Sequence, residues 1–331
     1  MRPLGIPSFD DKLVQEVLRM IMGAIYEGSF ENTSHGFRPK RSCHTALIQV
    51  QKNFTAAKWF IEGDIEGFFD NINHDVLIGI LKERIADDRF IRLRWKFLKA
   101  GYIEDWAFHR TYSGTPQGGI ISPILANIYL DKLDKYMKEY ADKFDKGERR
   151  GMNLEYKSYS GKIWWLGTKL KQTEDRETRK ELIDAIKQHQ KNRMHLPSVD
   201  EMDEGYRRIK YVRYADDFII GVIGSKADCV AIKEDIKNFL GEKLKLTLSE
   251  EKTLITHGNQ KAKFLGYEIY VRPFTDKTLR SEKSGVLIKA YGKKVVLEIP
   301  MSTMRDKLLY YEAMKIYQFE GKACLLYTSP S

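Results

Sequence analysis

Residues 209–223 read IKYVRYADDFIIGVI, and both the architecture and the chemistry that we expect follow from this segment. Two runs of strand-forming residues, 209–212 and 218–223, flank the adjacent carboxylates Asp216 and Asp217. This pattern predicts a β-hairpin with an aspartate pair at its tip. Adjacent carboxylates repel each other unless a cation neutralises them. The hairpin therefore predicts a divalent-metal site, which favours two-metal phosphoryl chemistry over generic acid–base catalysis.

A third carboxylate, Asp64, ends a strand predicted over 58–65 and lies next to a tight glycine turn. Two magnesium ions ~4 Å apart, bridged by shared carboxylates, stabilise both the attacking and the leaving oxygen of an in-line displacement. Asp64, Asp216 and Asp217 are a sufficient set, because Mg²⁺ keeps waters and substrate phosphate oxygens as its other ligands. We therefore expect two Mg²⁺ ions as cofactors, with Mn²⁺ as the alternative.

The composition indicates a folded, basic protein. Of 331 residues, 42% are hydrophobic, and 56 Lys and Arg against 46 Asp and Glu give a net charge of +10. A positive surplus favours nucleic acid as a partner, and equally fits a merely soluble basic protein. No apolar run approaches the ~20 residues that cross a bilayer, so we expect no membrane partner. Isolated cysteines and the lack of a signal peptide predict a cytoplasmic protein.

Helical and strand patterns are interspersed without a βαβ period, which favours the α+β class. Residues 141–205 are dense in charged side chains and are expected to form a surface insertion with a helix near 173–192. Trp164 and Trp165 are expected to pack this insertion onto the body, and the alternative is that they stack on bases. The other expected helices lie at 10–26, 42–57, 75–86, 88–100, 122–140, 226–241 and 300–319. The other expected strands lie at 244–248 and 262–272, with a further hairpin over 285–299.

In order along the chain, seven motifs resemble those of the reverse transcriptase family, specifically the group II intron-encoded type. The first five are RPLGIP (2–7), HGFRP (35–39), GDIEGFFDNINHDV (63–76), TPQGGIISPILANIYL (115–130) and YVRYADD (211–217). The last two are LSEEKT (248–253) and FLGY (264–267). The resemblance covers about residues 2–275.

This resemblance implies a right-hand polymerase architecture, with fingers and palm over residues 1–300. It implies the start of an incomplete helical thumb, or maturase region, over 301–323. The last eight residues, 324–331, read CLLYTSPS and resemble translated sequencing-adaptor read-through. We expect them to be a non-native tail, and we expect the chain to be truncated at both ends.

The resemblance also implies a metal and nucleotide site. Asp64 and Asp216 would hold both metals, Asp217 would complete the site, and the Ile65 carbonyl would add an oxygen. Phe69 would lie under the incoming sugar and exclude a 2′-hydroxyl, which favours deoxynucleotides. The residues expected to contact the nucleotide are Arg2, Phe69, Gln117 and Lys252. Arg38 would contact the template, and the primer end would rest on Phe264, Leu265 and Gly266.

The implied function is RNA-directed DNA polymerisation, with dNTP substrates, an intron RNA template and a DNA or RNA primer. RNA binding in intron splicing and mobility would accompany it, in the bacterial cytosol or nucleoid. The alternatives are an RNA-binding maturase that does not polymerise, a retron-type reverse transcriptase, and a nucleotide cyclase built on a similar palm. No oligomeric state is predicted.

Overall fold

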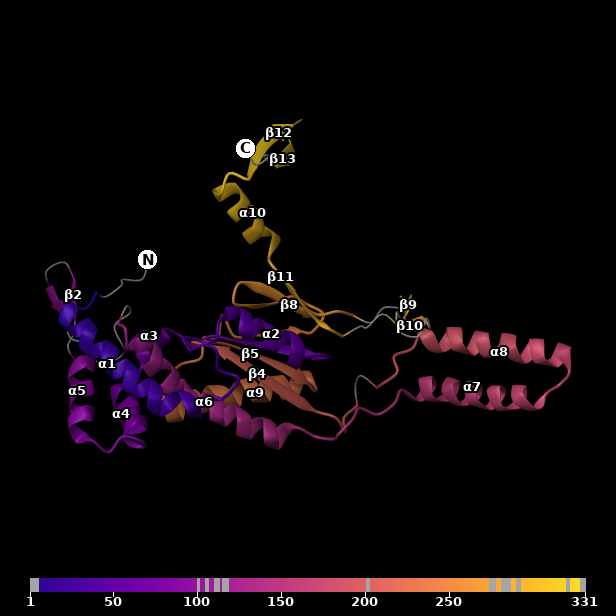
Figure 1. Cartoon of the computed structure of the whole chain (residues 1–331), viewed down its shortest axis with the longest axis horizontal. Helices are drawn as coiled ribbons and strands as arrows, with labels where there is room; N and C mark the ends of the chain where they lie inside the picture. Colours follow the sequence, from indigo (N-terminus) through magenta and orange to yellow (C-terminus); the bar gives the residue numbers. More distant parts are fainter. Residues whose placement is uncertain are drawn as a thin grey trace.

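A four-stranded antiparallel sheet with the order β4-β5-β1-β6 lies at the centre of the computed structural model (Figure 1). Its strands are β1 (Trp59–Gly63), β4 (Arg208–Tyr214), β5 (Asp217–Ile223) and β6 (Leu254–His257). The structure describes residues 6–99, 102–104, 107–109, 114, 119–200, 203–273, 278–280, 287–289, 293–319 and 322–327. Helices packed around an antiparallel sheet confirm the α+β class.

The central strands send alternate side chains into two different cores. Phe218 and Ile220 of β5 join the larger core, whereas Ile219 between them joins the smaller one. Ile61 and Phe60 of β1 divide in the same way. Successive side chains of a strand point to opposite faces, so a sheet that is covered on both faces needs a continuous apolar sequence. That requirement explains the unbroken apolar run of β5.

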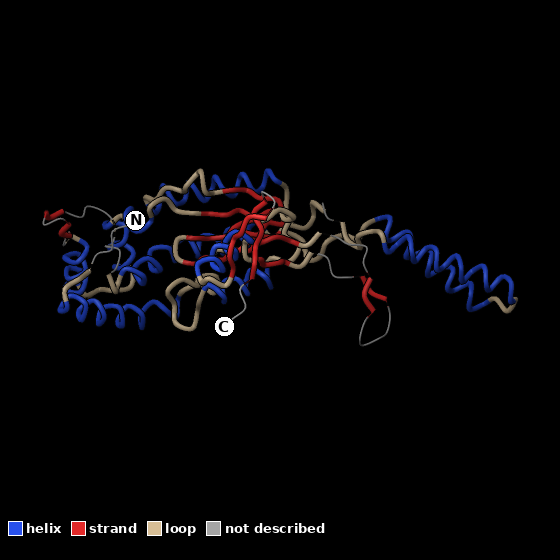
Figure 2. Tube along the Cα trace, turned by 90° about the horizontal axis from the view of Figure 1, so that it is seen from above, coloured by secondary structure: helices blue, strands red, loops and turns tan. Residues whose placement is uncertain are grey.

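Helices cover the face of the larger core, and one helix with a second sheet covers the other face (Figure 2). The first group comprises α1 (Phe9–Tyr26), α4 (His74–Lys82), α5 (Asp88–Leu98), α6 (Ser122–Phe144) and α9 (Lys226–Phe239). The second group comprises α2 (Cys43–Asn53), β7 (Ala262–Phe264), β8 (Tyr267–Val271) and β11 (Val295–Glu298). The smaller elements are η1 (Glu27–Ser29), α3 (Phe68–Asn71), β2 (Tyr102–Glu104), β3 (Ala107–His109), β9 (Thr278–Arg280) and β10 (Leu287–Lys289).

Polar side chains begin these helices. Ser42 forms a capping box at the start of α2, and Asn73 caps α4. The cap of α1 is Ser8, whose side chain accepts a hydrogen bond from the Asp11 backbone, and Asp10 and Asp11 lie in the first turn. Serine and aspartate cap equally well, and the choice depends on where the backbone first turns helical.

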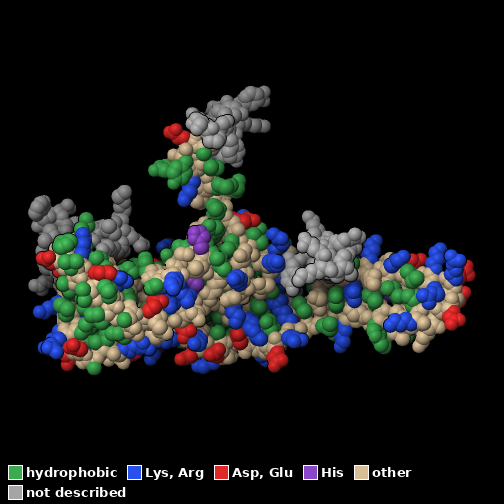
Figure 3. Space-filling view, viewed as in Figure 1, with side chains coloured by type: hydrophobic (Ala, Val, Ile, Leu, Met, Phe, Trp, Pro, Cys, Tyr) green, Lys and Arg blue, Asp and Glu red, His purple; other side chains and the backbone are tan. Residues whose placement is uncertain are grey.

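The charged insertion is a long helical hairpin that projects from the end of the palm sheet (Figure 1). It consists of α7 (Leu154–Gln172) and α8 (Arg176–Met194); the sequence predicts the second helix and misses the first. Trp164 is 73% exposed and Trp165 58%, so the prediction that they pack the insertion onto the body is wrong. Figure 3 shows Lys and Arg side chains spread over the visible face of this hairpin.

Two strand predictions fail after α9. The helix continues as the π-helical turn η2 (Leu240–Leu244), so no strand spans 244–248. The expected hairpin over 285–299 is also wrong, because β11 pairs with β8 rather than with β10. The strand expected over 262–272 is confirmed, although a turn divides it into β7 and β8.

The end of the chain is less helical than the sequence predicts. The expected helix over 300–319 is wrong in its second half, because α10 (Met301–Tyr310) is followed by β12 (Met314–Phe319). β12 pairs with β13 (Lys322–Tyr327), which includes the first part of the expected tail. The domain limits at 300 and 323 and the non-native origin of 324–331 stay predictions. Among the described residues, no helix is both long and apolar enough to span a membrane.

Candidate active site

The turn between β4 and β5 displays the aspartate pair. Tyr214 pairs with Asp217, which leaves Ala215 and Asp216 as the two residues of the turn. Ala215 has a φ of 56°, in the left-handed region that costs an L-residue with a Cβ roughly 1–2 kcal/mol. The predicted hairpin is therefore confirmed, and its turn carries backbone strain that neighbouring contacts must offset.

The sheet brings Asp64 next to this turn. β1 lies beside β5 with Gly63 opposite Phe218, so Asp64 and Asp217 follow at the same end of neighbouring strands. Neighbouring strands lie ~4.8 Å apart. A Cβ at Gly63 would lie 2.1 Å from the Phe218 ring, so only glycine allows the two strands to pack this closely. Residues separated by about half of the chain thus meet at one edge.

The backbone after Asp64 is held by the segment that follows η2. The Asp64 carbonyl accepts a hydrogen bond from the Ser249 amide at 2.9 Å, and Ile65 forms an isolated bridge with Leu248. Ile65 is 1% exposed, so its side chain belongs to the core and only its backbone can serve the site. This arrangement is compatible with the predicted use of the Ile65 carbonyl as an oxygen ligand.

The charges at this edge are strongly coupled. Burial, followed by the nearby charges of Asp216 and Asp64, raises the pKa of Asp217 to about 6. Lys252 acts in the opposite direction, and its Nζ lies 2.9 Å from Asp64 Oδ2. The Lys252 side chain is 64% exposed, whereas that of Asp64 is 19% exposed. Asp217 therefore feels the charges of two other carboxylates and of the exposed Lys252 ammonium group.

The donor set fits hard divalent cations, which prefer carboxylate and carbonyl oxygens. Within the described part of the chain, no three His, Cys, Asp or Glu side chains are already arranged as metal ligands. Asp64 instead directs its Oδ2 towards Lys252. The excess of negative charge among Asp64, Asp216 and Asp217 is what bound cations would neutralise.

Phe69 lies just beyond the turn that follows Asp64. Gly67, with a φ of 51°, begins the short helix α3, and Phe69 is half-buried against the larger core. A Cβ at Gly114 would lie 2.6 Å from the Phe69 carbonyl oxygen. This close contact restricts the backbone of Phe69. The point at which the Phe69 side chain leaves the backbone is therefore fixed beside the carboxylate edge. Its predicted role as a sugar gate stays a prediction.

The predicted primer-binding residues form a tight hairpin turn between β7 and β8. Leu265 and Gly266 have φ values of 52° and 78°, and Phe264 is buried in the smaller core. Glu62 of β1 ties this hairpin to the palm, since it accepts hydrogen bonds from the Lys263 amide at 2.8 Å and from Thr256 Oγ1 at 2.5 Å. The hairpin is thereby anchored to the strand that carries Asp64.

Arg38 lies inside the protein rather than on a template surface. Its side chain is 5% exposed and forms an ion pair with Glu27 at 2.9 Å. It also donates hydrogen bonds to the carbonyl oxygens of Glu31 and Ser34, at 2.7 and 2.9 Å. These contacts give Arg38 a role in holding the loop after α1, so burial argues against the predicted template contact. Arg2 and Gln117, the other expected nucleotide contacts, lie outside the described residues.

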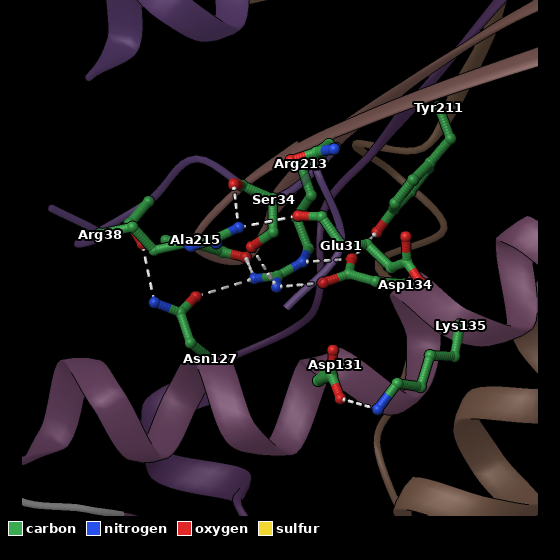
Figure 4. A network of polar contacts seen from close by, with 12 residues as sticks. Glu31, Ser34, Arg38, Asn127, Asp131, Asp134, Lys135, Tyr211, Arg213 and Ala215 are labelled. Atoms are coloured by element: carbon green, nitrogen blue, oxygen red, sulfur yellow. Dashed lines mark hydrogen bonds and ion pairs between the residues drawn. The ribbon is translucent and has the colours of Figure 1, made fainter. Parts of the chain in front are cut away.

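One residue that the sequence prediction does not single out organises the whole turn: Arg213, at the end of β4 (Figure 4). It is completely buried and pairs with Asp134 of α6 through two hydrogen bonds of 2.7 and 2.5 Å. The same guanidinium donates to Ser34 Oγ and to the Ala215 carbonyl oxygen, each at 2.7 Å. Burial disfavours its charge, yet Asp134 more than offsets this effect, so the pKa of Arg213 is raised.

The loop before Arg38 completes this arrangement. The backbones of Thr33 and His35 pair with Arg213, and Asn127 Nδ2 donates to the Gly36 carbonyl oxygen at 2.7 Å. A Cβ at Gly36 would lie 2.3 Å from the Ala215 nitrogen. The sequence does contain a signal for Arg213, because a charged residue inside an apolar strand requires a buried partner. It does not reveal that the partner is Asp134.

Comparisons with known proteins show which family the chain resembles. A family model described as reverse transcriptase (RNA-dependent DNA polymerase) matches residues 1–155 and 175–269. Group II intron-encoded protein LtrA of Lactococcus lactis subsp. cremoris is 53% identical over 272 residues, which are 82% of this chain and 45% of that protein. The putative COX1/OXI3 intron 2 protein of Saccharomyces cerevisiae is 40% identical over 86% of this chain and 32% of its own length.

More distant proteins also align. Nuclear intron maturase 1 of Arabidopsis thaliana is 24% identical over 89% of this chain and 45% of that protein. A solved structure of apo telomerase from Candida tropicalis, truncated from the C-terminal domain, matches 84% of this chain and 45% of that chain, at 14% identity and a TM-score of 0.44. The present chain spans less than half the length of these curated relatives.

Proposed function

The chain belongs to the reverse transcriptase family, and from that premise we propose that it is an RNA-directed DNA polymerase of the group II intron-encoded type. One observation supports this most strongly. Asp64, Asp216 and Asp217 come from distant parts of the sequence and meet at one edge of the palm sheet. A set of oxygen donors at one edge suits phosphoryl transfer to a nucleophile held in line.

In the proposed reaction, the primer 3′-hydroxyl oxygen attacks the α-phosphorus of a dNTP, and pyrophosphate leaves. Asp64, Asp216, Asp217 and the Ile65 carbonyl would hold two Mg²⁺ ions, with Mn²⁺ as the alternative. With the ions bound, the pKa of the 3′-hydroxyl would fall and the charge of the departing pyrophosphate would be neutralised.

The nucleotide would lie between the carboxylate edge and α3. Phe69 would close the space beneath the sugar and exclude a 2′-hydroxyl. Lys252 would turn from Asp64 to the triphosphate, since its exposed side chain has room to move. Arg2 and Gln117 complete the proposed nucleotide contacts.

The template and primer would cross the palm between the turn of β4–β5 and the turn of β7–β8. Phe264, Leu265 and Gly266 would support the primer end, because Glu62 anchors their hairpin to β1. Intron RNA as template, a DNA or RNA primer, and action in the bacterial cytosol or nucleoid belong to the same proposal. LtrA and the Arabidopsis maturase, by their names, are an intron-encoded protein and an intron maturase.

Primer extension tests the polymerase function directly. The chain, given an RNA template, an annealed DNA primer, dNTPs and Mg²⁺, should extend the primer. Asp216→Asn should lower the rate by ~10³-fold or more, beyond what the loss of a single electrostatic contact costs. Asp75→Asn is the matched control, because Asp75 lies in the first turn of α4 and outside the carboxylate set.

The rivals give different results in the same assay. A chain that binds RNA but extends no primer would refute the polymerase and leave a maturase. Activity without template and primer would indicate a nucleotide cyclase. Extension without any preference for intron RNA would favour a retron-type enzyme.

A further inference from the structure

The buried Arg213 binds the turn that displays Asp216 directly. Its Nη1 donates to the carbonyl oxygen of Ala215, the residue whose left-handed backbone forms the turn. Its Nε and Nη2 bind Asp134, and Nη2 also reaches Ser34. One rigid, planar group therefore connects the turn to α6 and to the loop before Arg38.

We propose that Arg213 is a positioning residue, which holds the turn so that Asp216 and Asp217 face Asp64. This inference rests on the proposed function, because those aspartates are taken as the metal ligands. Arg213 itself reaches neither substrate nor metal, since its side chain is completely buried. It acts through the Ala215 carbonyl, one peptide bond before Asp216.

The alternative is that the ion pair only stabilises the fold. Buried ion pairs are weak evidence for stability, because hydrophobic pairs of similar volume often replace them without loss. Here, however, the guanidinium also supplies the donor for a carbonyl in a strained turn. A hydrophobic pair can fill the volume, but it cannot bind that oxygen.

The loop that contains Gly36 further restricts where the Ala215 backbone can lie. Gly36 lies against the Ala215 nitrogen with no room for a side chain, and Asn127 binds the Gly36 carbonyl oxygen. Asn127 Oδ1 also lies 3.4 Å from Arg213 Nη1. The turn is thus held from two sides by groups that Arg213 organises.

Two variants separate positioning from stability. In the double variant Arg213→Met with Asp134→Leu, the volume is kept and both charges are removed. We expect it to fold, to keep its KM for dNTP within about threefold, and to lose ~10²-fold in kcat, as a misplacement of ~1 Å costs. A folded double variant with kcat within twofold of the unaltered chain would overturn the proposal.

Should the double variant not fold, Arg213→Lys decides the question. Lysine keeps the charge beside Asp134 but cannot also hold Ser34 and the Ala215 carbonyl oxygen. We expect a loss of ~10-fold or more in kcat, partly restored by adding Ala215→Gly, because glycine adopts the left-handed turn without strain. Tyr129→Phe is the matched control. It removes a buried hydrogen bond from α6, to the Leu244 carbonyl oxygen, away from the turn. A loss of kcat in Tyr129→Phe equal to that in Arg213→Lys, at equal Tm, would refute positioning.

Manganese binding, followed by electron paramagnetic resonance, keeps this inference separate from the polymerase proposal. We expect Asp216→Asn to abolish binding and Arg213→Lys to raise the Kd for Mn²⁺ by ~10-fold. If the unaltered chain binds Mn²⁺ but extends no primer, the polymerase proposal fails and the Kd shift still tests Arg213. Unchanged Mn²⁺ affinity in Arg213→Lys, or no Mn²⁺ binding by the unaltered chain, would overturn the positioning role.

Discussion

Adding a single methyl group at Gly36 should disable the turn that displays Asp216. The Cβ of Gly36→Ala would lie 2.3 Å from the Ala215 nitrogen and 3.0 Å from its Cα, whereas ordinary contacts begin at 3.4 Å. The two backbones must therefore separate by about 1.1 Å. Gly36 cannot easily retreat, because its carbonyl oxygen is bound to Asn127 and the preceding residue pairs with Arg213.

The magnitude follows from these contacts. Forcing one extra carbon into a packed interior costs about 1–3 kcal/mol. In a chain of this size each kcal/mol lowers the Tm by roughly 1–2 °C. If the turn yields rather than the loop, the displacement moves Asp216 by ~1 Å, which costs ~10²-fold in rate. We expect kcat to fall far more than the loss of stability explains.

Thermal unfolding and single-nucleotide primer extension, measured on the same preparation, check this expectation. Gly79→Ala is the matched control, because a Cβ at Gly79 has no neighbour within 4 Å. In the α4 helix that change should stabilise the chain by ~0.5–1 kcal/mol and leave kcat unchanged. A Gly36→Ala variant with kcat within twofold of the unaltered chain would show that the loop does not fix the turn.

Four further outcomes are expected. Burial lowers the pKa of His35, so its contribution to stability is complete above pH ~6.5 and is lost as the pH falls towards the folded-state pKa. The unfolding free energy from urea titration should therefore fall less steeply between pH 7.5 and 5.5 in His35→Gln. Replacing the exposed Trp164 and Trp165 with Ser should change stability by less than ~0.5 kcal/mol in thermal unfolding; a large loss would place them in a packed contact. Arg94 is completely buried, and its nitrogens have no hydrogen-bond partner within the described residues. Arg94→Met should therefore raise the Tm, because it removes an unpaired buried charge; a lower Tm would contradict this. The Kd for a template–primer duplex should rise by ~10³-fold or more between ~50 and ~200 mM salt if six or more phosphates are neutralised; a flat response would exclude a cleft that binds the phosphate backbone.

The sequence predicts the hairpin well, because its signal is local. Apolar runs on both sides of Asp216 and Asp217 determine where β4 ends and β5 begins. The strand before Asp64 is equally clear, since burial on both faces requires the apolar residues that the chain shows. That these two elements lie side by side is a non-local fact, which only the resemblance to a known family supplies.

The failures have physical causes. The alternating leucines at 244, 246 and 248 resemble a strand. Leu244 instead ends the π-helical turn η2, and Leu246 and Leu248 lie in the extended segment that follows; all three are buried in the larger core. The helix α7 buries no residue completely, so it lacks the apolar stripe by which a helix is recognised.

Two arginines of the candidate site show that the sequence does not identify partners that are distant in the chain. Arg38 was assigned to the template from its motif, and the structure turns it inward to Glu27. Arg213 received no role, although it binds the turn itself. In both cases the decisive partner is an acid elsewhere in the chain, and composition and spacing do not identify it.

The base of the α7–α8 hairpin makes the insertion separable from the rest of the protein. Its two ends leave the palm side by side, because the backbones of Lys146 and Arg207 exchange hydrogen bonds of 3.0 and 3.1 Å. This junction lies at the start of β4, about 20 Å of strand away from the Ala215 turn. A tight turn could join the two ends at little cost in loop-closure entropy. The hairpin can therefore be lengthened, exchanged, deleted or fused to another protein as a module, without redesigning the edge that carries Asp64, Asp216 and Asp217.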